Sequence, residues 1–157
     1  MKKLIIMSIM SVSLLANKVE PYIVGGLSTN HLFEEYNGVL NEHNNLIGIG
    51  VEYKKYELTY LHFDNSLYQK TNAILFRKNI DMKWNMSYNY GVAFTKGYVK
   101  DYVFIEDNIE YIAPNNFVLY KDYGIIPTIG LTYNNKHIDL NCDLFGNALI
   151  TSIKYKF

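Results

Sequence analysis

The stretch KWNMSYNYGVAFT, residues 83–95, decides the fold, because its side chains alternate with a strict period of two. The odd positions are polar or small, and the even positions from Trp84 to Phe94 are all large and apolar. Such alternation is typical of a β-strand with two unlike faces. The run is about as long as a tilted membrane-spanning strand, which needs ~9–11 residues, and it is longer than an average soluble strand.

The end of the chain repeats this pattern. Leu149, Thr151, Ile153, Tyr155 and Phe157 share one face, and the residues between them share the other. A last strand that ends on an aromatic residue resembles the C-terminal assembly signal of bacterial outer-membrane barrels. The two stretches together therefore predict strands that cross a membrane.

The rest of the chain divides into similar strands separated by turn residues. The predicted strands are residues 22–28, 46–53, 56–63, 68–77, 82–98, 123–133, 137–145 and 148–157. We expect an all-β fold, an eight-stranded antiparallel transmembrane β-barrel, because closure pairs the backbone groups that lipid cannot solvate. Residues 99–122 form the one long connection, which we place in an extracellular loop. A barrel of this size is too narrow for a wide pore.

The composition fits this fold and excludes some partners. Aromatic residues make up 15% of the chain and fifteen residues are tyrosine, which suits the aromatic girdles of a membrane barrel. The formal net charge is zero and no basic stripe occurs, so we exclude nucleic acid as a partner. A single cysteine excludes an intramolecular disulfide.

The first residues predict export. Residues 1–16 read as a signal peptide, with Lys2 and Lys3 before an apolar run that ends at Leu15. The alternative is an uncleaved anchor, although the run is short for a spanning helix. With cleavage after Ala16, residues 17–157 form the barrel domain, which we expect in the outer membrane of a Gram-negative cell.

Two places near the predicted barrel rim carry reactive side chains. His31 follows the first strand, where an imidazole can serve as a base. The turn after the third strand contains Asp64, Asn65 and Ser66, and a serine becomes a nucleophile only when a base reaches it. The alternative for the serine is an ordinary turn residue. No His/Cys cluster has metal-ligand spacing and no phosphate-binding glycine loop occurs, so we expect neither a metal nor a cofactor.

The inward faces of the predicted strands are rich in small residues, such as Gly48, Gly50, Gly91 and Gly130. Two readings stay open. Small residues allow tight packing inside the barrel, or they leave a slot for an acyl chain.

The order of several short motifs resembles the outer-membrane lipid A palmitoyltransferase family, including its shorter relatives in phage and bacterial genomes. The matching elements are His31, Asn41-Glu42, the glycine-rich stretch 47–51, Phe63-Asp64-Asn65-Ser66 with Lys70, Pro127 followed by Tyr133-Asn134-Asn135, and Lys156-Phe157. The resemblance spans most of the predicted mature chain.

In that family a histidine, an aspartate and a serine at the extracellular rim move a palmitoyl chain from a phospholipid to lipid A, without a cofactor. The resemblance implies that His31 is the general base and Ser66 the family's serine. The position before the serine is Asn65, and an asparagine cannot carry the charge that stabilises an imidazolium. Asp64, one place earlier, is the alternative partner of His31.

The main alternative is a non-enzymatic barrel whose loops act in surface masking, adhesion or phage exclusion. Asn65 favours it, as does the short stretch 17–21, where the family carries an amphipathic helix. A lipid A deacylase and a soluble ligand-binding barrel fit less well. For each hypothesis that places the barrel in a membrane, the expected partners are phospholipid, lipopolysaccharide and the outer-membrane assembly machinery. We expect the protein to be a monomer.

Overall fold

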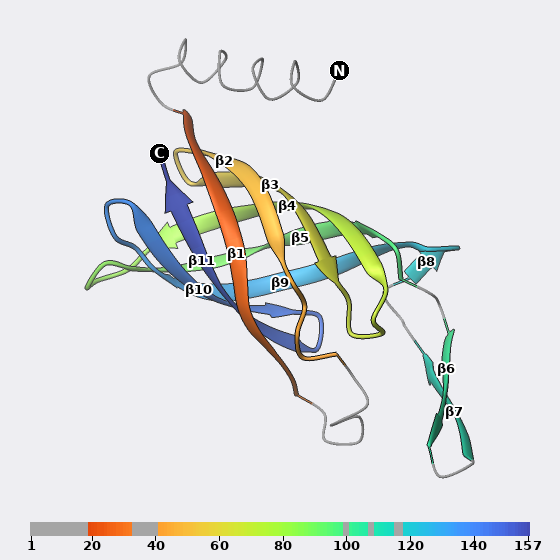
Figure 1. The fold of residues 1–157 in the computed structure, drawn as a ribbon. Coiled ribbons are helices and arrows are strands. Elements are labelled where there is room, and N and C mark those ends of the chain that lie inside the picture. Colours follow the sequence, from red (N-terminus) through yellow and green to blue (C-terminus); the bar gives the residue numbers. More distant parts are fainter. Residues whose placement is uncertain (1–18, 33–40, 99–100, 107–108, 115–117) are drawn as a thin grey trace.

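The computed structural model describes residues 19–32, 41–98, 101–106, 109–114 and 118–157. Its main unit is a closed antiparallel barrel of eight strands (Figure 1). These strands are β1 (Val19–His31), β2 (Ile47–Tyr53), β3 (Tyr56–Asp64), β4 (Lys70–Asp81), β5 (Met86–Lys96), β9 (Tyr123–Tyr133), β10 (Ile138–Phe145) and β11 (Ala148–Lys156). Each strand pairs with the next, and β11 pairs with β1 to close the wall. The predicted fold class is therefore confirmed.

Individual strand ends differ from the prediction. β5 begins at Met86 rather than at residue 82, and β4 continues to Asp81 rather than ending at residue 77. The reason is the turn between them, in which Trp84 and Asn85 adopt φ values of 58° and 56°. This left-handed conformation cannot continue a strand, and it is uncommon for residues other than glycine.

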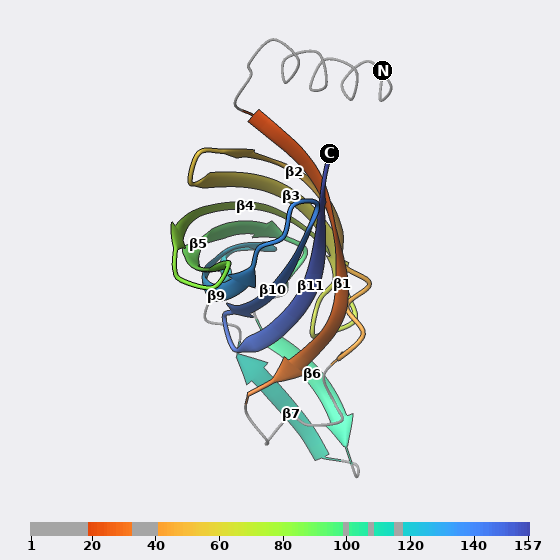
Figure 2. The same cartoon turned by 90° about the vertical axis from the view of Figure 1, so that its left-hand side faces the viewer.

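The predicted long loop contains three further strands. β6 (Asp101–Glu106) and β7 (Ile109–Pro114) form a separate two-stranded sheet, and β8 (Val118–Tyr120) pairs with the start of β9. Figures 1 and 2 show the β6–β7 hairpin extending away from the barrel wall. The predicted signal peptide, residues 1–16, lies outside the residues described.

The barrel has an apolar outer face and a mixed inner face. Outward side chains such as Ile49, Phe76, Phe94 and Leu131 are exposed on different strands, while the inward positions of β5 are buried serine, asparagine, alanine and threonine. This is the distribution of a barrel that faces lipid. Within the described part of the chain, no helix is long and apolar enough to cross a membrane.

The space beside the inward glycines is filled by bulky neighbouring side chains and is not an open slot for an acyl chain. A Cβ atom on Gly50 would lie 2.5 Å from the ring of Tyr22, and one on Gly48 would lie 2.7 Å from Leu61. The side chains that fill these spaces come from β1 and β3. The packing interpretation of the small residues therefore describes this structure better than the slot.

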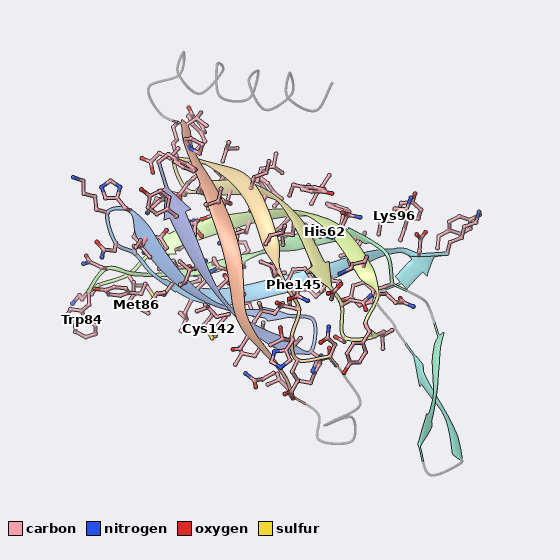
Figure 3. All side chains as sticks on the ribbon, in the orientation of Figure 1. His62, Trp84, Met86, Lys96, Cys142 and Phe145 are labelled. Carbon is pink, nitrogen blue, oxygen red and sulfur yellow. The ribbon has the colours of Figure 1, made fainter. Side chains whose placement is uncertain are left out.

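The two ends of the barrel differ. At one end β1 starts and β11 finishes, beside the short turns 54–55, 82–85 and 134–137; we name this the terminal end (Figure 1). At the opposite end lie His31, the turn 65–69 and the segment from Gly97 to Asp122; we name this the loop end. Figure 3 shows Trp84 at the terminal end and Lys96 toward the loop end.

Candidate functional site

His31 and Ser66 meet at the loop end. His31 is the last residue of β1, and Ser66 lies in the turn between β3 and β4. The distance from His31 Nε2 to Ser66 Oγ is 2.8 Å, and both residues are half-buried. Both residues are candidates from the sequence, and the structure brings them into hydrogen-bonding contact.

The segment 41–46 holds this contact in place between β1 and the turn. The Asn41 amide donates to the Ser66 carbonyl at 2.8 Å, and the Asp64 amide donates to the Asn44 carbonyl at 2.7 Å. The Asn44 side chain donates to Thr29 Oγ1 on β1. Asn41 and Asn44 are both buried. Backbone and side-chain hydrogen bonds of segment 41–46 therefore connect β1 with the serine turn, beyond the end of the β1–β2 pairing.

Asn65 shapes the turn and does not contact the histidine. Its Oδ1 accepts hydrogen bonds from the amides of Leu67 and Gln69, and its Nδ2 donates to Thr71 Oγ1 and the Gly97 carbonyl. The residue is 1% exposed. Its Oδ1 thus holds the turn, and its Nδ2 ties the turn to β4 and to Gly97, so Asn65 positions Ser66 through the backbone.

Asp64 points away from the histidine. Side chains alternate along β3, with Phe63 buried and Asp64 on the outer face. Its carboxylate lies 2.6 Å from Lys70 Nζ and accepts a hydrogen bond from Asn45 Nδ2 at 2.8 Å. The structure therefore brings neither Asp64 nor Asn65 into contact with His31. The role that the resemblance implies for them stays a prediction.

The chemistry available to His31 follows from its surroundings. The last outward apolar side chain on β1 is Leu27, so His31 lies at the rim beyond the apolar wall. Burial lowers the pKa of His31 below its ordinary value, and the charge of Glu42 opposes this shift. A neutral imidazole can accept a proton from Ser66. Among the described residues, the buried Nδ1 atom of His31 has no hydrogen-bond partner. No described carboxylate therefore orients the imidazole ring through this atom.

Below the rim, the lumen is filled by an apolar layer. Phe63 and Phe145 meet edge to face, with ring centroids 6.1 Å apart. Ala148, which pairs with His31, belongs to the same cluster. The other buried members are Leu46, Leu61, Ala73, Leu75, Ala93, Ile126 and Ile150.

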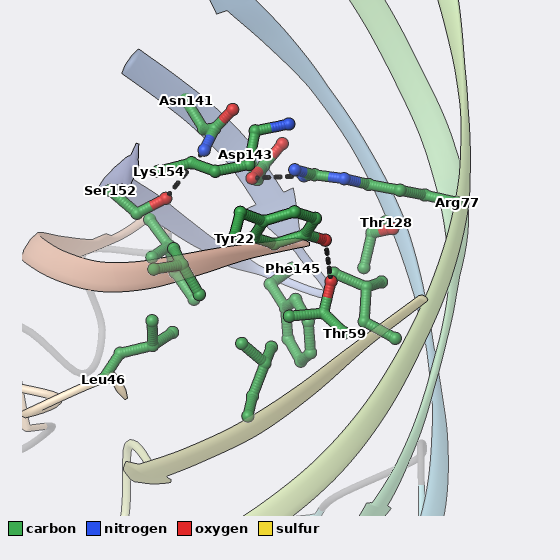
Figure 4. Close-up of a pocket in the computed structure, with 14 residues that line it drawn as sticks. Tyr22, Leu46, Thr59, Arg77, Thr128, Asn141, Asp143, Phe145, Ser152 and Lys154 are labelled. Carbon is green, nitrogen blue, oxygen red and sulfur yellow. Dashed lines mark hydrogen bonds and ion pairs between the residues drawn. The ribbon is translucent and has the colours of Figure 1, made fainter. Parts of the chain in front are cut away.

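Toward the terminal end the lumen holds a polar network to which every barrel strand contributes. Its members are Tyr22, Glu52, Glu57, Arg77, Asn89, Thr132, Asp139, Asn141, Asp143, Ser152 and Lys154. Glu57 lies 2.5 Å from Arg77 Nε and 2.5 Å from Lys154 Nζ. Arg77 also reaches Asp143 at 2.9 Å (Figure 4). Sequence reasoning missed this network; the signal was charged residues at inward positions of predicted strands.

The cavity between these layers is small. It has a volume of about 30 Å³. The residues that line it include Tyr22, Leu46, Arg77 and Phe145 (Figure 4). Binding pockets for small molecules measure about 300–1,000 Å³. This cavity therefore has no room for a long acyl chain. Among the residues that the structure covers, no group of His, Cys, Asp or Glu side chains could hold a metal ion.

Comparisons with known proteins give similar folds at very low identity. No protein-family model matches the chain, and no curated protein matches it. The chain is similar to the crystal structure of neisserial surface protein A, with 10% identity and a TM-score of 0.45 over 90% of this chain and 98% of that one. It is also similar to the N-terminal β-barrel domain of Pseudomonas aeruginosa OprF, with 11% identity and a TM-score of 0.44 over 90% and 98%. The outer-membrane protein Ail of Yersinia pestis matches with 9% identity and a TM-score of 0.45 over 88% and 99%.

The fold and the site together define a class: a closed eight-stranded barrel with a filled lumen and a histidine–serine contact at one rim. None of the comparisons reported above points to the lipid A palmitoyltransferase family in particular.

Proposed function

We propose that this protein is an integral barrel of the outer membrane of a Gram-negative cell that acts at the cell surface through its loop end. The observation that carries the proposal is the apolar outer face of a closed barrel. Exposed side chains such as Ile49, Phe76, Phe94 and Leu131 lie on several different strands. A soluble monomer rarely exposes an apolar patch above ~600 Å², because water disfavours it. A bilayer removes that cost.

Because buried side chains fill the lumen, we place the function at the ends of the barrel and not in a channel through it. Glu57, Arg77 and Lys154 lie inside the lumen and are at most 4% exposed. At the loop end the β6–β7 hairpin extends away from the wall (Figure 2). A projecting hairpin on a rigid barrel suits contact with another surface or molecule, as in adhesion, masking of a receptor or exclusion of a competing phage.

Epitope tagging of intact cells tests this proposal. One variant carries a tag between residues 107 and 108, in the hairpin, and the matched control carries it between Asn134 and Asn135, in a terminal-end turn. Antibody should stain intact cells that carry the hairpin tag, and should stain the control only after the outer membrane is opened. Staining of both, or of the turn tag alone, would contradict the orientation. Deleting residues 101–114 should abolish surface binding or exclusion while leaving the barrel in the membrane.

A second candidate function is acyl transfer at the rim, and the His31–Ser66 contact favours it. A serine hydroxyl 2.8 Å from an imidazole is the arrangement in which a base can activate a hydroxyl. The contact lies where the outer-leaflet lipid would be in the proposed orientation. The acceptor would be lipid A and the donor a phospholipid. Because the cavity beside the apolar layer is small, the acyl chain would lie outside that cavity or displace the apolar layer.

Mass spectrometry of lipid A tests this second candidate. The chain is expressed in a Gram-negative strain that lacks its own palmitoyltransferase. The enzyme hypothesis predicts an acyl-extended lipid A that disappears in Ser66→Ala and in His31→Ala. The matched control is Ser28→Ala, an exposed serine on the outer face of β1. An unchanged lipid A profile with the barrel correctly placed would reject the enzyme hypothesis.

A further inference from the structure

The three turns at the terminal end share one chemistry. Each carries at least one exposed lysine within three residues of an exposed aromatic residue. The β2–β3 turn has Lys54 and Lys55 between Tyr53 and Tyr56, the β4–β5 turn has Lys83 next to Trp84, and the β9–β10 turn has Lys136 after Tyr133. We name the lysines and aromatic residues of these turns the basic rim.

The basic rim has a net positive charge. Lys55 pairs with Asp81 at 3.3 Å, which neutralises one lysine. Within the described residues, no ion pair involves Lys54, Lys83 or Lys136. The loop end differs in charge, since Lys70 pairs with Asp64 and the segment 97–122 contains five acidic residues and two lysines.

The aromatic members of the rim are presented outward. Trp84 is 87% exposed, and it holds a left-handed φ of 58° that leaves its ring at the tip of the turn (Figure 3). Lys54 Nζ lies 5.2 Å from the centre of the Tyr53 ring, and Lys78 Nζ lies 5.8 Å from that of Tyr56. Tyrosine and tryptophan settle at the level of lipid head groups, because one end of the ring system is apolar and the other is wet.

We propose that the basic rim binds the head groups of anionic phospholipids in the membrane leaflet at the terminal end. The lysines contact the phosphates, and the aromatic rings lie one level deeper, beside the glycerol backbone. The charge of the rim and that of an anionic head group are complementary, and a lysine near an anionic membrane surface gains about 1 kcal/mol. This inference rests on the proposed function, since it requires the barrel to span a bilayer.

Trp84 is the sole tryptophan of the chain, so its fluorescence reports directly on the rim. The full-length protein is folded into phosphatidylcholine vesicles that contain a fixed small fraction of a brominated lipid, which quenches tryptophan on contact. The brominated lipid is phosphatidylglycerol in one series and phosphatidylcholine in the other. We expect stronger quenching by brominated phosphatidylglycerol, with a local enrichment of roughly fivefold that falls as salt is added.

Two matched variants locate the effect. In Lys54→Gln/Lys83→Gln/Lys136→Gln, which removes one lysine from each turn, the preference for the anionic lipid should disappear. In Lys70→Gln/Lys96→Gln/Lys121→Gln, which removes three exposed lysines at the loop end, the preference should remain.

The outcomes separate this inference from the proposed function. A heat-modifiable gel band shows whether each protein has inserted as a barrel. Inserted wild-type protein with equal quenching by both lipids would overturn the lipid proposal and leave the membrane barrel standing, whereas failure to insert would overturn both. Equal loss of preference in the two triple variants would also overturn it, because the binding would then not belong to the terminal end.

Discussion

Replacing Arg77 by methionine tests the lumen network most severely. Arg77 is 4% exposed and contacts two carboxylates, Glu57 at 2.5 Å and Asp143 at 2.9 Å. Methionine keeps much of the side-chain volume but leaves both carboxylates without this partner. Breaking a buried ion pair from one side costs about 3–5 kcal/mol, because the remaining charge is buried and uncompensated.

The loss is measured as a shift of the urea unfolding midpoint in lipid vesicles, approached from the folded and from the unfolded side. With a slope of about 2 kcal/mol per molar urea, a loss of 4 kcal/mol lowers the midpoint by about 2 M. Asp143→Asn in the Arg77→Met background should recover part of the loss, since Asp143 has no other ion pair among the described residues, whereas Glu57 keeps Lys154.

The matched control is Lys70→Met. Lys70 also pairs with a carboxylate, Asp64 at 2.6 Å, but its side chain is 70% exposed. Such exposed pairs add little to stability, so the midpoint of this variant should equal that of the wild type. If Arg77→Met and Lys70→Met unfold at the same urea concentration, the lumen is hydrated and the argument from burial is wrong.

Three further predictions concern the rim and the wall. Asn65→Ala should lower the free energy of unfolding by about 1–3 kcal/mol and expose its turn to added protease, because buried backbone amides lose their acceptor. Gly130→Ala should cost about 1–3 kcal/mol by the urea midpoint, because a Cβ there collides with Asp143, whereas Gly25→Ala should be neutral, since nothing lies within 4 Å of its added Cβ. Because burial lowers the pKa of His31, the unfolded chain binds the proton more readily. Wild type should therefore lose more stability than His31→Gln as the pH falls below about 6.5, and an equal loss in both would contradict the burial.

The fold could be predicted from local patterns, because a strand with one polar and one apolar face shows alternating polar and apolar residues in the sequence. β5 shows this, with Tyr88 and Phe94 outward and Asn89 and Ala93 inward. The turn at residues 82–85 was not predictable, because Trp84 gives no sign that it adopts a left-handed conformation. The strands inside the long loop were missed because each of them is only three to six residues long.

The candidate site was predicted in part for a similar reason. His31 ends β1 and Ser66 follows β3 at the same end of the barrel, so their proximity follows from topology. The face on which Asp64 lies is set by the alternation of side chains along β3. The predicted strand ended one residue earlier, at residue 63, so the prediction left the direction of Asp64 open. The ion pair between Arg77 and Asp143 crosses the lumen, and it could not be predicted from the sequence. The stagger of all eight strands around the barrel decides which inward side chains face each other across the lumen.

Fractionation of expressing cells tests the central claim, that the apolar outer face lies in a membrane. Membranes from a Gram-negative host are washed with urea or alkaline carbonate, separated by density, and run on gels with and without boiling. The account predicts that the protein stays in the outer-membrane fraction and migrates faster without boiling, as a closed barrel does. Recovery in the soluble periplasmic fraction, with a single mobility in both lanes, would contradict it.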